Sequence, residues 1–428
     1  MKTYTGIVCT LLLCTACKKS YPGLYAEIID PDNPNPEITV DTIPIQISLT
    51  DPSFALVTDT RGTGPFGFWN DEEERQKWLN AEFGVYAFLT QNHQFTETAD
   101  LSAGEIPDGS GIPYCLIDDR KAHISPACEL MWDDIEPPCY SVAYPEYKFN
   151  FFLYHIGEPE ALLGTDKYRD RVIKHIRIDG TQDVISAYAR PNMDNVASLG
   201  DNEESKYLMN HAGDLIYSTK SGRLHIDPHF RVRHELSRLN FKVKAAEDLE
   251  QGCSVGIEAV GIIVPTWLDF TVAADWNGIS ADWNDETLPP TGLTWNNNVV
   301  GDTIYVPTST TPTTFGATFN RSETTFKPNI MVHDKNEEAK AFGRPLLVPP
   351  VNKISMIIYY RYYTPEGHFI PNGSLFVMRY NEVKIDGNGF QANQQHEVLL
   401  QVHGPQSIKV EIDGKGLAWD SGGDIEVE

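Results

Sequence analysis

The most constraining feature of this chain is a series of short runs in which apolar and polar residues alternate, separated by Gly, Pro, Asp and Asn. A period of two places every second side chain on one face, as in half-buried antiparallel strands. Such runs span residues 43–49, 85–88, 147–156, 215–217, 239–243, 255–264, 354–363, 375–380, 398–402 and 408–412. Helical periodicity is confined to residues 71–79 and 203–210. The sequence therefore predicts an all-β protein.

The polar segment 218–227 separates two halves of similar size, each with enough strands for its own β-sandwich. We expect a boundary near Gly222, with an N-terminal sandwich domain over residues 41–221 and a C-terminal one over 222–428. No internal period of about 20–50 residues appears, which argues against a propeller or a solenoid.

The N-terminus has the features of an export signal. Residues 1–16 contain one Lys and an apolar run far shorter than the roughly 20 residues that span a bilayer. The end of this segment, LCTAC over 13–17, resembles a bacterial lipobox, which predicts cleavage before Cys17 and its lipidation. An ordinary secretory signal is the alternative. Acyl chains would anchor the protein at the outer membrane, and residues 17–40, rich in Pro, Asp and Asn, would form a tether.

The charge balance restricts the partners. The chain has 428 residues, with 60 acidic and 34 basic side chains and a formal charge of −26. It has no run rich in Lys or Arg, and clustered positive charge is what phosphate binding needs. We therefore expect no nucleic-acid partner.

Three cysteines lie in a Pro-containing stretch, at Cys115, Cys128 and Cys139. Their spacing is wider than the two to four residues typical of zinc ligands, and an exported protein meets an oxidising compartment. We interpret them as a disulfide staple of undetermined connectivity in a loop. Buried thiols are the alternative.

Motifs that suggest catalysis lack the required context. Residues 62–67 match G-x-G-x-x-G, and residues 252–256 match G-x-S-x-G, but neither lies in an α/β setting. The group of His225, His229 and His234 with Asp227 and Glu235 lacks the spacing of a metal site. We predict no enzyme activity, no cofactor and no metal site.

The stretch 229–245 reads HFRVRHELSRLNFKVKA, and it resembles a segment of fimbrillin-family lipoproteins, the subunits of type V pili. Three further features are similar and occur in the same order: the lipobox, the strand 83–88 after a Thr-Arg segment, and the C-terminal stretch 389–419. The resemblance spans nearly the whole chain.

This resemblance implies two transthyretin-like Greek-key β-sandwiches after a lipidated leader. It also implies that an arginine-specific protease removes the leader with the first strand, and that a strand of another subunit then fills the vacated groove. The protein would pass through the inner membrane, reside on the outer membrane and end in a cell-surface fimbrium.

The N-terminal sequence is compatible with such processing. Ile43, Ile45, Ile47 and Leu49 alternate with less apolar residues, which predicts one buried face and an apolar groove if the strand is removed. Arg61 and Gly62 follow in a Gly/Thr/Pro stretch suited to an exposed loop, so we expect cleavage between them. The alternative is a permanently retained strand and an ordinary surface arginine.

The C-terminus leaves the position of the subunit open. Ile408, Val410 and Ile412 form an alternating run that is a candidate donor strand, and only a short tail follows it. Either this run is donated, or it is fixed and the chain is a tip or adhesive subunit that accepts a strand without giving one.

A surface glycan-binding lipoprotein is the competing hypothesis, with a host or bacterial glycan or protein as partner. It rests on aromatic residues in expected loops that have the chemistry to stack on sugar rings: Trp69, Trp132, Trp267, Trp276 and Trp283.

Overall fold

The structure is a computed structural model. It describes residues 42–49, 72–89, 114–127, 129–142, 147–157, 159–189, 217–223, 226–247, 249, 253–274, 291–296, 301–308, 311, 319, 330–364, 369–370, 376–385, 389–404, 407–412 and 417–418. Within these residues the protein is all-β, as predicted, with helices α2 (Glu72–Asn80) and α5 (Thr219–Arg223) and the 3₁₀ turn η2 (Pro159–Ala161). Neither described helix has the length and apolar character to cross a membrane.

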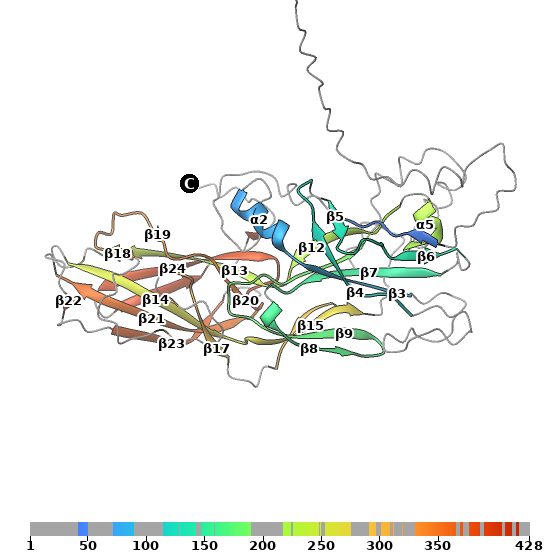
Figure 1. The fold of residues 1–428 in the computed structure, drawn as a ribbon. Coiled ribbons are helices and arrows are strands. Elements are labelled where there is room, and N and C mark those ends of the chain that lie inside the picture. The colour runs from blue at the N-terminus through green and yellow to red at the C-terminus, as the bar shows by residue number, and fades with distance from the viewer. Residues whose placement is uncertain are drawn as a thin grey trace, which may run out of the picture.

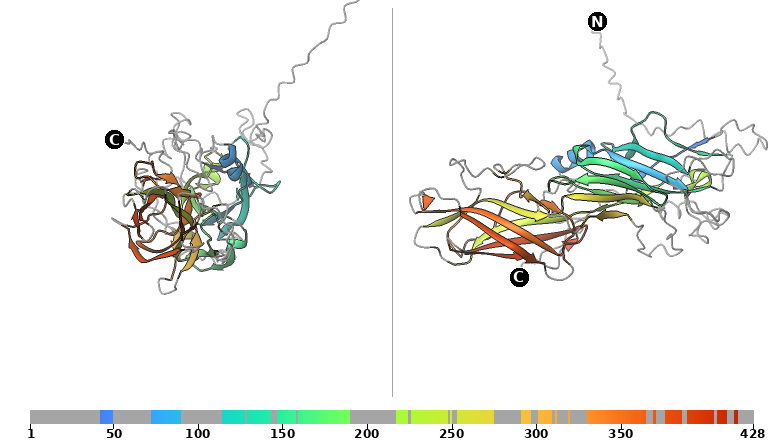
Figure 2. Two further views of the ribbon diagram at one scale, coloured as in Figure 1. Left: turned by 90° about the vertical axis from the view of Figure 1, so that its left-hand side faces the viewer. Right: turned by 90° about the horizontal axis from the view of Figure 1, so that it is seen from below.

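The described strands form two sandwiches that lie end to end (Figures 1 and 2). In the first, sheet 1 runs β2 (Ser48–Leu49), β12 (His229–His234), β10 (Ile185–Ala189), β7 (Lys148–His155), β3 (Phe83–Leu89), β4 (Cys115–Ile124) and β5 (Leu130–Trp132), with β11 (Tyr217–Ser218) beside β7. Sheet 2 runs β16 (Gly292–Thr294), β15 (Trp267–Ala274), β9 (Arg171–Arg177) and β8 (Leu162–Lys167). A separate ribbon pairs β1 (Thr42–Pro44) with β6 (Cys139–Ser141).

The second sandwich also has two sheets. Sheet 3 runs β19 (Lys340–Ala341), β13 (Ser237–Ala245), β24 (Gln394–Gly404) and β25 (Ser407–Ile412), with β20 (Leu346–Val348) beside β13 and β26 (Leu417–Ala418) beside β24. Sheet 4 runs β17 (Asp302–Tyr305), β14 (Ser254–Val264), β21 (Lys353–Tyr363) and β22 (Phe369–Ile370), with β18 (Ile330–Val332) beside β14 and β23 (Phe376–Lys384) beside β21. Apolar side chains of β13, β14, β21 and β24 fill the space between these sheets.

Sheet 1 is buried on both faces. Along β3, Phe83, Val85 and Ala87 belong to one apolar cluster, whereas Tyr86 and Phe88 belong to the cluster shared with sheet 2. The first of these clusters also contains side chains of α2 and of the β1–β6 ribbon, which cover sheet 1 on the side away from sheet 2 (Figure 1). The first half of the molecule is thus a sandwich with an additional cover layer, which includes the N-terminal segment.

The sheets do not divide at the boundary expected near Gly222. Strands β12 and β15, which follow that residue, pair with β10 and β9 of the first sandwich. The polar segment there is not a linker, because its hydroxyl groups are bonded: the Ser218 N–H donates to Ser221 Oγ within the segment, and Thr219 Oγ1 donates to the Ser141 carbonyl of β6. Sequence composition therefore misplaced the division.

The chain crosses between the sandwiches with very short connections. Strand β12 continues into β13 after two residues, and β14 continues into β15 after two residues. The junction is also held by the bond from the Leu347 N–H of β20 to the Gly180 carbonyl, 2.8 Å. On the first-sandwich side of the crossing, His234 Nδ1 lies 2.7 Å from Asp183 Oδ2.

Candidate functional site

The N-terminal segment 42–49 has two short strands, β1 and β2, separated by residues 45–47, which belong to no strand. β1 pairs antiparallel with β6, in a register that places Ile43 opposite Tyr140. β2 pairs parallel with β12, and Ser48 lies opposite His229. The sequence predicted one continuous strand here, whereas the structure breaks it because the two halves pair with different elements. We call this stretch the N-terminal segment below.

The three isoleucines of the N-terminal segment are buried, as their alternation predicted. Ile43, Ile45 and Ile47 are 2%, 1% and 7% exposed, whereas the intervening Gln46 is exposed. All three belong to the cluster between the cover layer and sheet 1. At roughly 2 kcal/mol for each fully buried aliphatic side chain, their burial is the main attraction that holds the segment.

The position of Ile43 is closely bounded by α5 and β6. A Cβ placed on Gly222 would lie 3.1 Å from Ile43 Cγ2 and 3.1 Å from Tyr140 Cδ2. Any side chain at 222 would therefore require both neighbours to shift by a few tenths of an ångström, so the glycine allows close packing here. The Tyr140 ring packs against Phe149 and Phe151, with ring centroids 6.2 and 6.3 Å away, and burial raises the pKa of Tyr140 well above its usual range.

The backbone of Ile45 is bonded on both sides to the chain around the β5–β6 loop (residues 133–138). Its N–H donates to the Pro138 carbonyl at 2.8 Å, and its carbonyl accepts from Trp132 Nε1 at 2.9 Å. These bonds replace the strand pairing that the segment lacks between β1 and β2. Because they involve only the backbone of the segment, any residue except proline at this position could make both bonds.

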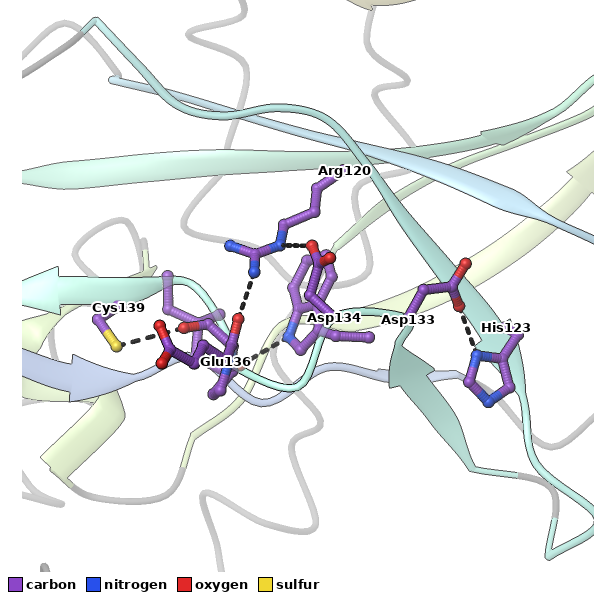
Figure 3. Close-up of polar contacts among 9 residues, drawn as sticks. Arg120, His123, Asp133, Asp134, Glu136 and Cys139 are labelled. Carbon is purple, nitrogen blue, oxygen red and sulfur yellow. Dashed lines mark hydrogen bonds and ion pairs between the residues drawn. The ribbon is translucent and has the colours of Figure 1, made fainter.

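Three polar contacts at the surface hold the β5–β6 loop (Figure 3). Arg120 Nε lies 2.6 Å from Asp134 Oδ2, and the same guanidinium donates to the Glu136 carbonyl. His123 Nδ1 lies 2.5 Å from Asp133 Oδ1. Both acidic side chains are substantially exposed, so each pair contributes little stability, about 1 kcal/mol or less. The β5–β6 loop is thus a surface element that is hydrogen-bonded to the N-terminal segment at Ile45.

Ser48 makes the side-chain bond that is most specific within the segment. Its Oγ lies 2.9 Å from His229 Nδ1 and 3.5 Å from the Pro228 carbonyl, while its N–H donates to that carbonyl at 2.9 Å. Burial lowers the pKa of His229, so the imidazole is neutral at neutral pH. A hydroxyl suits either tautomer of a neutral imidazole, because it both donates and accepts.

The cysteines expected in a loop lie partly in strands. Cys115 begins β4, where its Sγ donates to the Ile117 carbonyl, and Cys139 begins β6 with its Sγ 3.5 Å from the Pro137 carbonyl. The two are not bonded to each other, and Cys128 lies outside the described residues. Burial, followed by the charge of Asp118, raises the pKa of Cys115 to about 12, which leaves a poorly reactive thiol. The staple as a whole stays a prediction.

The candidate donor strand is part of its own chain's sheet. β25 pairs antiparallel with β24, with Ile408 opposite Val402 and Val410 opposite Leu400. Ile408 is 3% exposed, and Val410 and Ile412 pack at the margin of the same core. Donation of this strand would therefore require it to leave sheet 3.

The structure also locates other residues that the sequence analysis considered. Ser254 lies in β14 rather than at a strand-to-helix turn, and His229 and His234 occupy opposite ends of β12. Cys17, Arg61, Gly62 and the glycine motif at 62–67 lie outside the described residues. So does the expected helix over 203–210, and nothing is described of the Leu49 side chain.

Sequence reasoning missed Trp132 and Gly222 as parts of this site, and it weighed His229 as a metal ligand, rejected that role and assigned it no other contact. A buried indole N–H usually finds an acceptor, but the sequence gives no sign that this acceptor is the Ile45 carbonyl, 87 positions away. The glycine appeared as a boundary signal because its packing partners are equally remote in sequence.

No family model matches the chain, and no curated protein matches it. Among solved structures it is similar to a fimbrial protein from Bacteroides vulgatus, at 13% identity and a TM-score of 0.48, over 88% of this chain and 99% of that one. It is also similar to the fimbrial anchor protein Mfa2 from Porphyromonas gingivalis, at 10% identity and a TM-score of 0.29, over 88% of this chain and 98% of that one.

Proposed function

We propose that this chain is a structural subunit of a type V pilus that assembles by loss of its N-terminal segment and insertion of a strand from another subunit. The observation that carries the proposal is the N-terminal segment itself. Three buried isoleucines lie on a stretch that belongs to the cover layer, not to the interior between sheets 1 and 2. Its departure would expose an apolar groove and unpaired backbone groups, which strand addition satisfies.

The remaining parts of the proposal follow the sequence resemblance. Residues 1–16 are a lipoprotein signal peptide, Cys17 carries the lipid, and residues 17–40 tether the protein to the outer membrane until cleavage. The two sandwiches are transthyretin-like with Greek-key connections. The partners are other pilus subunits, and the cell-surface fimbrium is the final location.

Cleavage between Arg61 and Gly62 is the first expected result. Residues 18–428, treated with an arginine-specific protease, should yield a single new N-terminus at Gly62, together with oligomers detected by size-exclusion chromatography and mass measurement. Arg61→Ala should abolish both. Arg171→Ala is the matched control, because Arg171 is an exposed arginine with 46% of its side chain accessible, and its loss should change neither.

The outcomes separate the alternatives. Cleavage that leaves monomers would indicate a terminal subunit that accepts a strand without donating one, in agreement with the pairing of β25 in its own sheet. Resistance at Arg61 would refute processing at this position.

A glycan-binding surface is the second candidate, favoured by one exposed aromatic residue of sheet 2. Trp267 is 53% exposed, and the Arg177 guanidinium lies 5.1 Å from the centre of its ring. An exposed indole supported by a cation has the chemistry to stack on a sugar ring. Retention of the protein on polysaccharide columns should fall at least tenfold with Trp267→Ala and be unchanged with Met331→Ala, another exposed apolar residue. Equal retention of both variants would reject Trp267 as a sugar-binding residue.

A further inference from the structure

The N-terminal segment contacts its surroundings by three kinds of interaction, and these differ in how much they depend on sequence. Backbone pairing with β6 and the two bonds at Ile45 depend on no side chain of the segment. The packing of the buried isoleucines requires apolar side chains of suitable shape. The bond between position 48 and His229 requires a hydroxyl group at position 48. A groove vacated by this segment would therefore discriminate among incoming strands by their residues at the apolar positions and at position 48.

The apolar positions demand alternating residues of limited size. Ile43, Ile45 and Ile47 are all β-branched, a class that suits extended backbone. At the first of them Gly222 and Tyr140 pack closely, since a Cβ at 222 would lie 3.1 Å from both Ile43 Cγ2 and Tyr140 Cδ2. Many strands meet this demand, because alternating Val and Ile are common in β-sheets. These positions alone select weakly.

Position 48 is more selective, because a polar atom of the groove faces it. His229 Nδ1 lies 2.9 Å from Ser48 Oγ, and the imidazole is only half-buried but neutral. An aliphatic residue there would lose this hydrogen bond, and a carboxylate, which only accepts, would fit only the tautomer with the hydrogen on Nδ1. Threonine retains the hydroxyl and adds the β-branch that strands favour.

We propose that His229 is a specificity-determining residue of the groove, and that it selects incoming strands in which the third alternating β-branched residue is followed directly by Ser or Thr. This inference rests on the proposed function. It assigns a chemical class to the partner: an extended segment of the pattern β-branched, any, β-branched, any, β-branched, hydroxyl.

The pattern has a consequence for self-assembly. Ile408, Val410 and Ile412 match the three apolar positions, but Asp413 follows them where the N-terminal segment carries Ser48. A second copy of this chain would therefore place a carboxylate opposite His229. The groove thus favours a hydroxyl-bearing strand of a different subunit over β25 of its own kind.

Synthetic peptides test the selection directly. The full chain is cleaved at Arg61, the released segment is removed, and fluorescent peptides of residues 42–49 are titrated with Ser, Thr or Val at position 48. The Ser and Thr peptides should bind with similar affinity, and the Val peptide, which is isosteric with Thr, about tenfold more weakly. A peptide of residues 407–414 should bind weakly and improve about tenfold when Asp413 is replaced with Ser.

Variants at His229 assign the effect to that residue. His229→Leu should bring the affinities for the Thr and Val peptides to within twofold of each other. His229→Asn, which keeps a polar atom near the position of Nδ1, should retain most of the difference and guards against a folding defect in the first variant. Equal binding of the Thr and Val peptides to the cleaved wild-type protein would overturn the inference while leaving strand insertion intact.

The uncleaved chain provides a test that does not require strand exchange. Ser48→Val should speed hydrogen exchange at the amide of residue 48, which bonds to the Pro228 carbonyl, about tenfold relative to Ser48→Thr. If no peptide binds the cleaved protein but this difference is seen, the proposed function fails and the role of His229 in holding a hydroxyl stands. If Ser48→Val and Ser48→Thr exchange alike, the role of His229 fails.

Discussion

Replacing Ile45 with alanine is expected to weaken the attachment of the N-terminal segment by about 2–4 kcal/mol, because a fully buried isoleucine is lost and a cavity is left. The segment has few other attachments between β1 and β2, so it should detach locally before the sandwiches unfold. Hydrogen exchange at residues 43–49 should accelerate by at least about 30-fold, as 2 kcal/mol implies. Gln46→Ala, at the exposed neighbouring position, should change exchange by less than about threefold.

The same variant bears on assembly. After cleavage at Arg61, the Ile45→Ala segment should leave the protein faster than the wild-type segment, as measured by the mass of the retained fragment. Unchanged exchange at residues 43–49 in Ile45→Ala would mean that the isoleucine does not hold the segment. The groove would then have no strong apolar position at its centre.

Replacing Asp119 with alanine is expected to lower the free energy of unfolding by about 3–5 kcal/mol, because it leaves the ammonium group of Lys174 inside the first sandwich without its carboxylate. Lys174 is 2% exposed, and its Nζ lies 2.6 Å from Asp119 Oδ2. The Tyr154 hydroxyl donates to the other carboxylate oxygen. The tyrosine ring faces the ammonium, with its centre 5.1 Å away, but a ring does not replace a counter-ion.

Asp118→Ala is the matched control for this change. Asp118 is the adjacent carboxylate, it is half exposed, and it pairs with the exposed Lys167, so its loss should cost less than about 1 kcal/mol. The double variant Asp119→Ala with Lys174→Met should recover most of the stability, since both charges are then absent. Equal denaturant midpoints for Asp118→Ala and Asp119→Ala would contradict the importance of the buried pair.

The pH dependence of stability should follow the same carboxylate. Burial acts to raise the pKa of Asp119, but the bonds from Lys174 and Tyr154 outweigh it and hold the pKa below its usual range. A group whose pKa is lower in the folded state stabilises the protein above its unfolded pKa, near 4, and this contribution is lost as the pH falls below that value. The acid-induced loss should be smaller in the Asp119→Ala, Lys174→Met double variant.

Strand positions were predictable from the sequence where one face of a strand meets water or where both faces are apolar. The runs at 239–243 and 398–402 alternate, and they form β13 and β24. Strand β4 was missed, since it carries Asp118, Asp119, Arg120 and Lys121 in succession, and such a run looks like a loop. Its charged side chains pair with residues of other strands and loops, and the sequence does not reveal these partners.

The N-terminal segment could be predicted as a buried strand, but its surroundings could not. Isoleucines at every second position imply an apolar face without saying what it covers. Ser48 and His229 are 181 positions apart, and only the fold brings them together. The expected boundary at Gly222 failed for the same reason, because local polarity was taken for a linker while the hydroxyl groups are bonded within the segment and to β6.

The short crossings between the sandwiches determine how the molecule responds to tension. The chain passes from one sandwich to the other at residues 235–236, returns at 265–266, and passes again between β16 and β17. A pull on the ends is therefore borne by several covalent connections side by side, and bending at one of them is opposed by the others. Two domains joined by a single linker can rotate relative to each other about that linker, whereas these two sandwiches should keep a fixed relative orientation and transmit force as one rigid unit.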